Sequence, residues 1–79
     1  MRPEDFRAYL KKTPFQPFRI TLTDGRTYEV KHPELAMVGR TSVLIGMAAS
    51  DESEPVYDRF VTISLLHIMQ MEPLQHAAN

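Results

Sequence analysis

The chain has 79 residues, a net charge of −1 and no cysteine, and these properties exclude several classes of protein. A chain this short makes one domain (1–79) with a small core, for which oligomerisation is a common remedy. Without cysteine it has neither disulfides nor thiolate metal sites. No apolar run approaches the roughly 20 residues that span a bilayer, and the first residues show no apolar signal region. We therefore expect a soluble, cytoplasmic protein with no membrane contact.

Charge is unevenly divided along the chain. Residues 1–40 hold eight basic and five acidic side chains, whereas residues 41–79 hold one basic and five acidic. This split hints at a basic surface. However, nucleic-acid-binding domains usually have a clearly basic balance, and this chain as a whole does not.

Residues 3–12 predict a short amphipathic helix. A proline suits its first position, and acidic residues in the first turn and basic ones in the last complement the helix dipole. Phe6, Tyr9 and Leu10 share one face at helical spacing. We expect this helix to cap an open end of a small barrel; the alternative is a helix offered to a partner.

Two alternating stretches, 18–23 and 26–31, predict a β-hairpin around an Asp-Gly turn. A two-residue loop would place a glutamate on the apolar face. A three-residue loop over 23–25, with glycine in the bulge position, gathers the apolar residues on one face. It also sets Arg19 opposite Glu29 on the other face, so we predict the three-residue loop.

The rest of the chain predicts further short strands in meander order. The stretch 42–47 is apolar on both faces at its centre, which favours a central strand. The acidic run 50–58 predicts an exposed, mobile loop, and residues 73–79 a flexible tail. The remaining expected elements are strands at 35–38, 59–64 and 68–72 and a tight helical turn at 65–67, with a helix over 64–71 as the rival to the last turn and strand.

Together these elements predict a mainly β domain, α+β by count. A short N-terminal helix precedes a five- to six-stranded, strongly bent antiparallel small barrel over 18–72, whose closure would remove exposed strand edges. The pattern Ile-x-Leu-x-Asp-Gly-Arg over 20–26 is similar to the first motif of the Sm-like barrels, relatives of the SH3-like barrels. Residues 63–72 occupy the place of the second motif. The resemblance implies an Sm-like or SH3-like barrel and, for the Sm type, RNA binding.

A longer stretch carries a second resemblance. Residues 14–34 read Pro-Phe-x-Pro-Phe-x-Ile-x-Leu-x-Asp-Gly-Arg-x-Tyr-x-Val-x-His-Pro-Glu. This phrase resembles small bacterial proteins of uncharacterised function. The resemblance implies a bacterial source and transfers no activity.

Basic and aromatic side chains in the first half of the chain form the candidate binding patch. Cations contact phosphates and aromatic rings stack on bases, so this combination suits nucleic acid or another partner. The alternative is a solvated strand face above core aromatics. The six candidate residues are Arg19, Arg26, Tyr28, Lys31, His32 and Arg40.

No set of residues predicts a catalytic or metal site. His32 and His67, if their strand ends met, would join Glu34 in a two-histidine, one-carboxylate set able to hold a divalent metal. Their spacing matches no metal motif, and a histidine before proline is more typical of a turn. The three glycines are scattered and form no phosphate loop. We expect no enzyme activity, metal or cofactor.

The function expected from these patterns is a small non-enzymatic interaction or assembly module. Its partner would be another copy of the chain or another protein, bound by strand addition at an exposed edge of strand 42–47 or strand 59–64. The alternative is an RNA- or single-strand-binding module of the Sm type. The two differ in salt dependence, because phosphate contacts release counterions and strand-edge contacts do not.

Overall fold

A computed structural model describes residues 1–48 and 57–74. Within this part of the chain there are one α-helix and six strands, with single 3-10 turns before two of the strands. The elements are α1 (Pro3–Leu10), β1 (Phe18–Leu22), β2 (Thr27–Val30), η1 (Pro33–Leu35), β3 (Ala36–Val38), β4 (Ser42–Ala48), β5 (Tyr57–Ser64), η2 (Leu65–His67) and β6 (Ile68–Pro73). The expected mainly β domain with one short N-terminal helix is confirmed.

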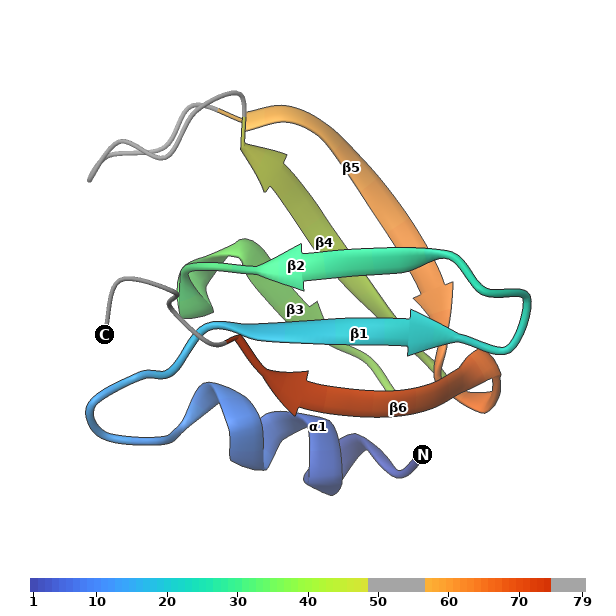
Figure 1. Cartoon of the computed structure of the whole chain (residues 1–79), viewed down its shortest axis with the longest axis horizontal. Coiled ribbons are helices and arrows are strands. Elements are labelled where there is room, and N and C mark those ends of the chain that lie inside the picture. The colour runs from blue at the N-terminus through green and yellow to red at the C-terminus, as the bar shows by residue number, and fades with distance from the viewer. Residues whose placement is uncertain (49–56, 75–79) are drawn as a thin grey trace.

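The strands form two three-stranded antiparallel sheets (Figure 1). One has the order β2-β1-β6 and the other the order β3-β4-β5. The chain changes sheet twice, at η1 between β2 and β3 and at η2 between β5 and β6. Among the described residues no strand pairing joins the two sheets, so the continuous closed sheet that we expected is not seen.

The hairpin between β1 and β2 has the predicted three-residue loop. Ile20 lies opposite Tyr28, and the N–H of Leu22 donates to the carbonyl of Arg26 at 2.8 Å. Gly25 has a φ of +92°, which a residue without a Cβ adopts at no steric cost. A slip of one residue would turn every side chain to the opposite face and expose the buried apolar ones. Burial of this face therefore stabilises the observed register.

Phe18, at the start of β1, is the centre of the core. Its ring is fully buried. The centroid of this ring lies 5.7 Å from the ring centroid of Phe6, 5.1 Å from that of Tyr9 and 6.1 Å from that of Phe15. Phe6 and Tyr9 come from α1, and Phe15 comes from the proline-flanked link before β1. One strand residue thus holds the helix and the link against the sheets.

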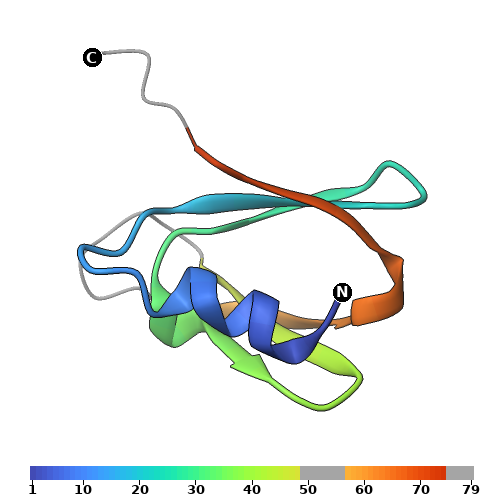
Figure 2. The same cartoon turned by 90° about the horizontal axis from the view of Figure 1, so that it is seen from below.

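The helix α1 covers the side of the molecule where β3 and β6 are edge strands. Figure 2 shows it lying between β6 (red) and β3 (green). The hydroxyl of Tyr9 donates to the carbonyl of Met71 in β6 at 3.4 Å, so the helix also contacts the outer backbone of that strand. At eight residues α1 is short, and no helix in the described part of the chain is long and apolar enough to cross a bilayer.

The predicted helix boundary was wrong by one half-turn. The helix ends at Leu10 and not at residue 12, with Lys11 as the C-cap. Thr13 directly precedes Pro14, and the proline ring disfavours helical backbone at the residue before it. The helix therefore stops before the link.

The predicted limits of the acidic loop and of the tail were also wrong. Tyr57 and Asp58 belong to β5, because the pairing with β4 continues across a bulge to Ala48. Pro73 belongs to β6, and the N–H of the next residue, Leu74, donates to the carbonyl of residue 17 at 2.9 Å. The rest of both segments, 49–56 and 75–79, lies outside the described residues.

The strand β4 is central in its sheet, as its two apolar faces predicted. For the same reason the expectation that strand 42–47 offers an exposed edge was wrong, because β3 and β5 pair with both of its sides. The tight turn at 65–67 followed by a strand is confirmed over the rival helix. Ser64 begins this turn, and its hydroxyl accepts the N–H of Leu66 at 3.3 Å.

Candidate functional site

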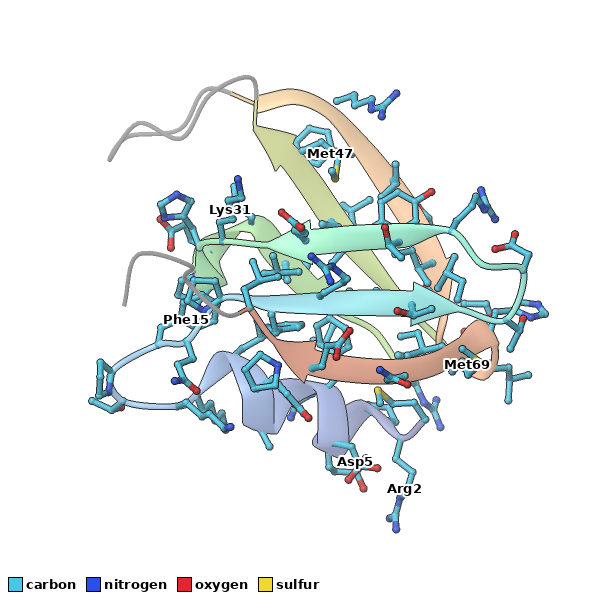
Figure 3. All side chains as sticks on the ribbon, viewed as in Figure 1. Arg2, Asp5, Phe15, Lys31, Met47 and Met69 are labelled. Carbon is cyan, nitrogen blue, oxygen red and sulfur yellow. The ribbon has the colours of Figure 1, made fainter. Side chains whose placement is uncertain are left out.

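The six residues of the predicted patch do not lie on one surface. Arg19 is on β1, and Lys31 follows the end of β2; Figure 3 shows Lys31 far from the hairpin loop that precedes β2. Arg26 and Tyr28 lie at the hairpin end of β2, whereas Arg40 lies in the turn between β3 and β4. His32 stands just before η1. The fold therefore splits the patch into separate places.

Carboxylates accompany the cations on the outer face of the first sheet. Arg19 lies 3.2 Å from Glu29 on β2 and 3.8 Å from Glu72 on β6, and Lys31 lies 4.0 Å from Glu29. These four side chains, which we call the outer charge network, hold two positive and two negative charges. The network links all three strands of its sheet and has no net charge.

The two histidines of the hypothetical metal set do not meet. His32 precedes η1 at the β2–β3 corner, and His67 ends η2 at the β5–β6 corner, at opposite sides of the molecule (Figure 1). The chain passes from one sheet to the other at each of these corners, and the strands β3, β4 and β5 lie between the two corners in the chain. The topology therefore keeps the two histidines apart. Among the described residues no three histidine, aspartate or glutamate side chains form a metal-sized group.

The structure reveals a groove between β5 and the β1–β2 hairpin. We call this groove the edge groove. Its volume is about 430 Å³. Two of the lining residues, Leu22 and Ile63, are buried and apolar, whereas the other seven all carry a polar group. The lining residues are Leu22, Thr23, Asp24, Arg26, Tyr28, Thr62, Ile63, Ser64 and His67.

An ion pair fixes the hairpin side of the edge groove. The carboxylate of Asp24 accepts the backbone N–H of Arg26 at its Oδ1 atom, at 3.0 Å, and the Nε of the same arginine at Oδ2, at 2.8 Å. The backbone N–H first, and the guanidinium next, lower the pKa of Asp24. In return the carboxylate raises the pKa of the Arg26 guanidinium. Both groups are therefore charged at neutral pH.

On the β5 side of the edge groove, the direction of the backbone groups follows from the pairing with β4. The N–H of Leu65 donates to the carbonyl of Thr41 at 2.9 Å, on the β4 side. In an antiparallel ladder, the N–H and C=O of one residue point to the same side of the strand, and those of the next residue point to the other side. The backbone groups of Ile63 therefore face β4, whereas Thr62 and Ser64, which both line the groove, direct their N–H and C=O groups away from β4.

One end of the edge groove is closed by a backbone hydrogen bond. The N–H of Thr23 in the hairpin loop donates to the carbonyl of His67 in η2 at 2.8 Å. In the other direction β5 continues to Phe60, whose side chain is 57% exposed. The groove is thus a slot with one closed end and one end leading along the strand edge.

Two of the predicted patch residues, Arg26 and Tyr28, line the edge groove. Its β5 and η2 residues were not predicted as site residues, because nothing in the sequence indicates that residues 62–67 return to the hairpin loop. The alternation of hydroxyls at Thr62 and Ser64 was the one local signal of an outward-facing row. No family model, curated protein or solved structure matches this chain.

Proposed function

We propose that this chain is a non-enzymatic interaction and assembly module that binds another copy of itself, or another protein, by adding a strand to the edge of β5. The observation that supports this most is the position of β5 at the end of the order β3-β4-β5. Its eight residues make it the longest of the six strands. Exposed edges of this kind invite strand pairing unless charges, proline or bulges protect them.

The residues of β5 next to the edge groove offer little such protection. Between residues 59 and 64 Arg59 is the single charged residue, and there is no proline. Phe60 adds an exposed aromatic side chain on this strand. Thr62 and Ser64 direct backbone donors and acceptors outward, so an incoming strand would gain both hydrogen bonds and apolar contact.

We further propose that the two sheets are an open variant of the Sm-like or SH3-like small barrel in a cytoplasmic, bacterial protein. The supporting feature is the pair of single-turn corners, η1 and η2, at which the chain passes from one sheet to the other. The Ile-x-Leu-x-Asp-Gly-Arg pattern over 20–26, which ends at the hairpin turn, is the corresponding sequence feature.

Replacing Thr62 by proline tests the edge proposal. Because the N–H of Thr62 points away from β4, proline removes no hydrogen bond of the β4–β5 ladder, and edge strands tolerate proline at such positions. We expect T62P to keep the circular dichroism spectrum of the wild type. We also expect it to weaken self-association by tenfold or more in sedimentation equilibrium.

Two control variants bracket this test. T62A keeps the backbone N–H and should associate like the wild type, whereas I63P removes a donor that faces β4 and should unfold the chain. Equal association of the wild type and T62P would contradict self-pairing at β5. The partner at β5 would then be another protein, and T62P would be expected to weaken its binding.

A nucleic-acid-binding function is the second candidate. It is favoured by Arg7 and Arg40, which line one hollow of about 370 Å³ beside α1. Against it, both terminal nitrogens of Arg19 lie beside carboxylates, those of Glu29 and Glu72, and a phosphate would have to displace them. Fluorescence anisotropy with single-stranded RNA at two salt concentrations separates the candidates, because phosphate contacts weaken steeply with salt.

A further inference from the structure

We propose that the edge groove is a carboxylate-binding site for an extended peptide, whose main chain pairs with β5 and whose carboxylate lies between Arg26 and His67. This inference rests on the proposed strand addition at β5 and specifies the chemistry of the partner. The carboxylate is either the C-terminus of the peptide or an aspartate or glutamate side chain within it.

The balance of hydrogen-bonding groups in the edge groove favours an acceptor. Asp24 is the one carboxylate among the described residues that line the groove, and both of its oxygens already accept bonds from Arg26. This pairing uses the Nε of Arg26, and the guanidinium also interacts with the Tyr28 hydroxyl, so the remaining N–H groups of its two terminal nitrogens are the donors for a ligand. Hydroxyls, ring nitrogens and the outward backbone N–H groups of Thr62 and Ser64 add further donors. A carboxylate, which accepts several hydrogen bonds, complements this set.

The main-chain part of the site follows from β5. Thr62 and Ser64 each present one N–H and one C=O on the groove side of the strand. A peptide in extended conformation satisfies these groups at two-residue intervals, as a neighbouring strand does. Further along β5, away from the closed end, it reaches the exposed Phe60.

The carboxylate is placed at the closed end by the fold itself. The hydrogen bond from Thr23 to His67 joins the hairpin loop to η2 and prevents the peptide from continuing past Ser64. The Asx turn and the ion pair of Asp24 hold Arg26 beside this end before any ligand binds. Holding donors in position beforehand lowers the entropy that binding costs.

The test uses the full chain and three fluorescein-labelled synthetic heptapeptides of alternating threonine and valine. The first has a free C-terminal carboxylate, the second a C-terminal amide, and the third a C-terminal amide with one internal glutamate. Fluorescence anisotropy measures the dissociation constant of each. We expect at least one carboxylate peptide to bind tenfold or more tightly than the neutral amide, since charge-assisted hydrogen bonds are about twice as strong as neutral ones.

Two variants with the same change in charge locate the effect. R26Q should reduce the preference for the carboxylate to less than threefold, and the backbone N–H of residue 26 can still bond to Asp24. R19Q changes the outer charge network instead and should leave the preference unchanged. H67Q gives a second test at the closed end that leaves the hairpin loop intact.

The outcomes separate this inference from the proposed function. Equal affinity for all three peptides, with T62P weakening each of them, overturns carboxylate recognition and keeps strand addition at β5. Equal loss in R19Q and R26Q also overturns the site, because the attraction would then be general. If no peptide binds and T62P self-associates like the wild type, both proposals fail. The tighter of the two carboxylate peptides identifies the C-terminus or the side chain as the source.

Discussion

At the scale of single residues, Phe18 and Asp24 show two different ways in which one side chain organises this small chain. Phe18 acts through packing, with three aromatic rings from α1 and the link around its own. Asp24 acts through hydrogen bonds, with both carboxylate oxygens occupied by Arg26 at the hairpin turn. Phe18 thus contributes to the core, and Asp24 shapes one wall of the edge groove.

We predict that F18A lowers the free energy of unfolding by about 3–5 kcal/mol, the usual cost of truncating a buried phenylalanine. The total stability of a chain this size is roughly 4–12 kcal/mol, so F18L serves as a milder variant if F18A does not fold. The matched control is F60A, at a side chain that is 57% exposed, which should cost far less. Urea denaturation followed by circular dichroism measures both, and equal losses would contradict the central role of Phe18.

The hairpin turn should depend on pH through Asp24. Its pKa in the folded chain is lowered, first by the backbone N–H of Arg26 and then by the guanidinium. Because the folded pKa lies below the unfolded value of about 3.9, ionised Asp24 stabilises the turn above that pH. This contribution is lost as the pH falls through the folded pKa. Carbon-13 NMR of the carboxyl group should show a midpoint below 3.9, and a midpoint above it would contradict the hydrogen-bonding pattern.

At the scale of elements, the two central strands carry the sheets. The strand β1 lies between β2 and β6, and β4 lies between β3 and β5. On the outer face of the first sheet, Arg19 of β1 contacts carboxylates on both neighbouring strands. The outer charge network thus ties the first hairpin to the last strand of the chain.

We predict a coupling free energy of about 0.2–1 kcal/mol between Arg19 and Glu29, the range for half-exposed ion pairs. A double-mutant cycle with R19A and E29A measures it by urea denaturation, and 1 M salt should reduce it. The pair of Arg2 and Glu4 is a control, since its atoms lie closer, at 2.8 Å, but both side chains are more exposed. A larger coupling in the control pair would show that distance, and not the link between strands, decides the value.

At the scale of the whole molecule, the two sheets leave different sides open. The helix α1 covers the side between β3 and β6, whereas the edge groove lies between β5 and the β1–β2 hairpin. Exposed apolar side chains also lie outside the core, including Met37 on β3, Leu66 in η2 and Met69 on β6. These three side chains therefore add apolar surface outside the core.

Amide hydrogen exchange should reflect this division. We predict the slowest exchange in β1 and β4, whose backbone groups pair on both sides, and fast exchange at Thr62 and Ser64, which face the edge groove. Raising the protein concentration should slow exchange at Thr62 and Ser64 if copies pair along β5. Heteronuclear NMR at two concentrations measures the effect. Slow exchange at these two amides in the dilute protein would contradict their outward orientation.

Local patterns in the sequence were sufficient for the hairpin, the central position of β4 and the turn at 65–67. Each depends on neighbours within about ten residues: alternation decides which face is buried, and the positive φ of Gly25 suits only a particular loop. Element ends were less predictable. Asp58 looked like part of an acidic loop, but pairing with β4 extends the strand through it.

The sequence by itself determined the local elements of this protein, because hydrophobic period and turn chemistry act over short distances. It did not reveal that the strands divide into two sheets, that the patch residues separate, or that Thr23 meets His67. These features depend on residues far apart in the chain, and the packing of the two sheets decides them. The tertiary structure alone therefore created the edge groove, since one wall comes from residues 22–28 and the other from residues 62–67.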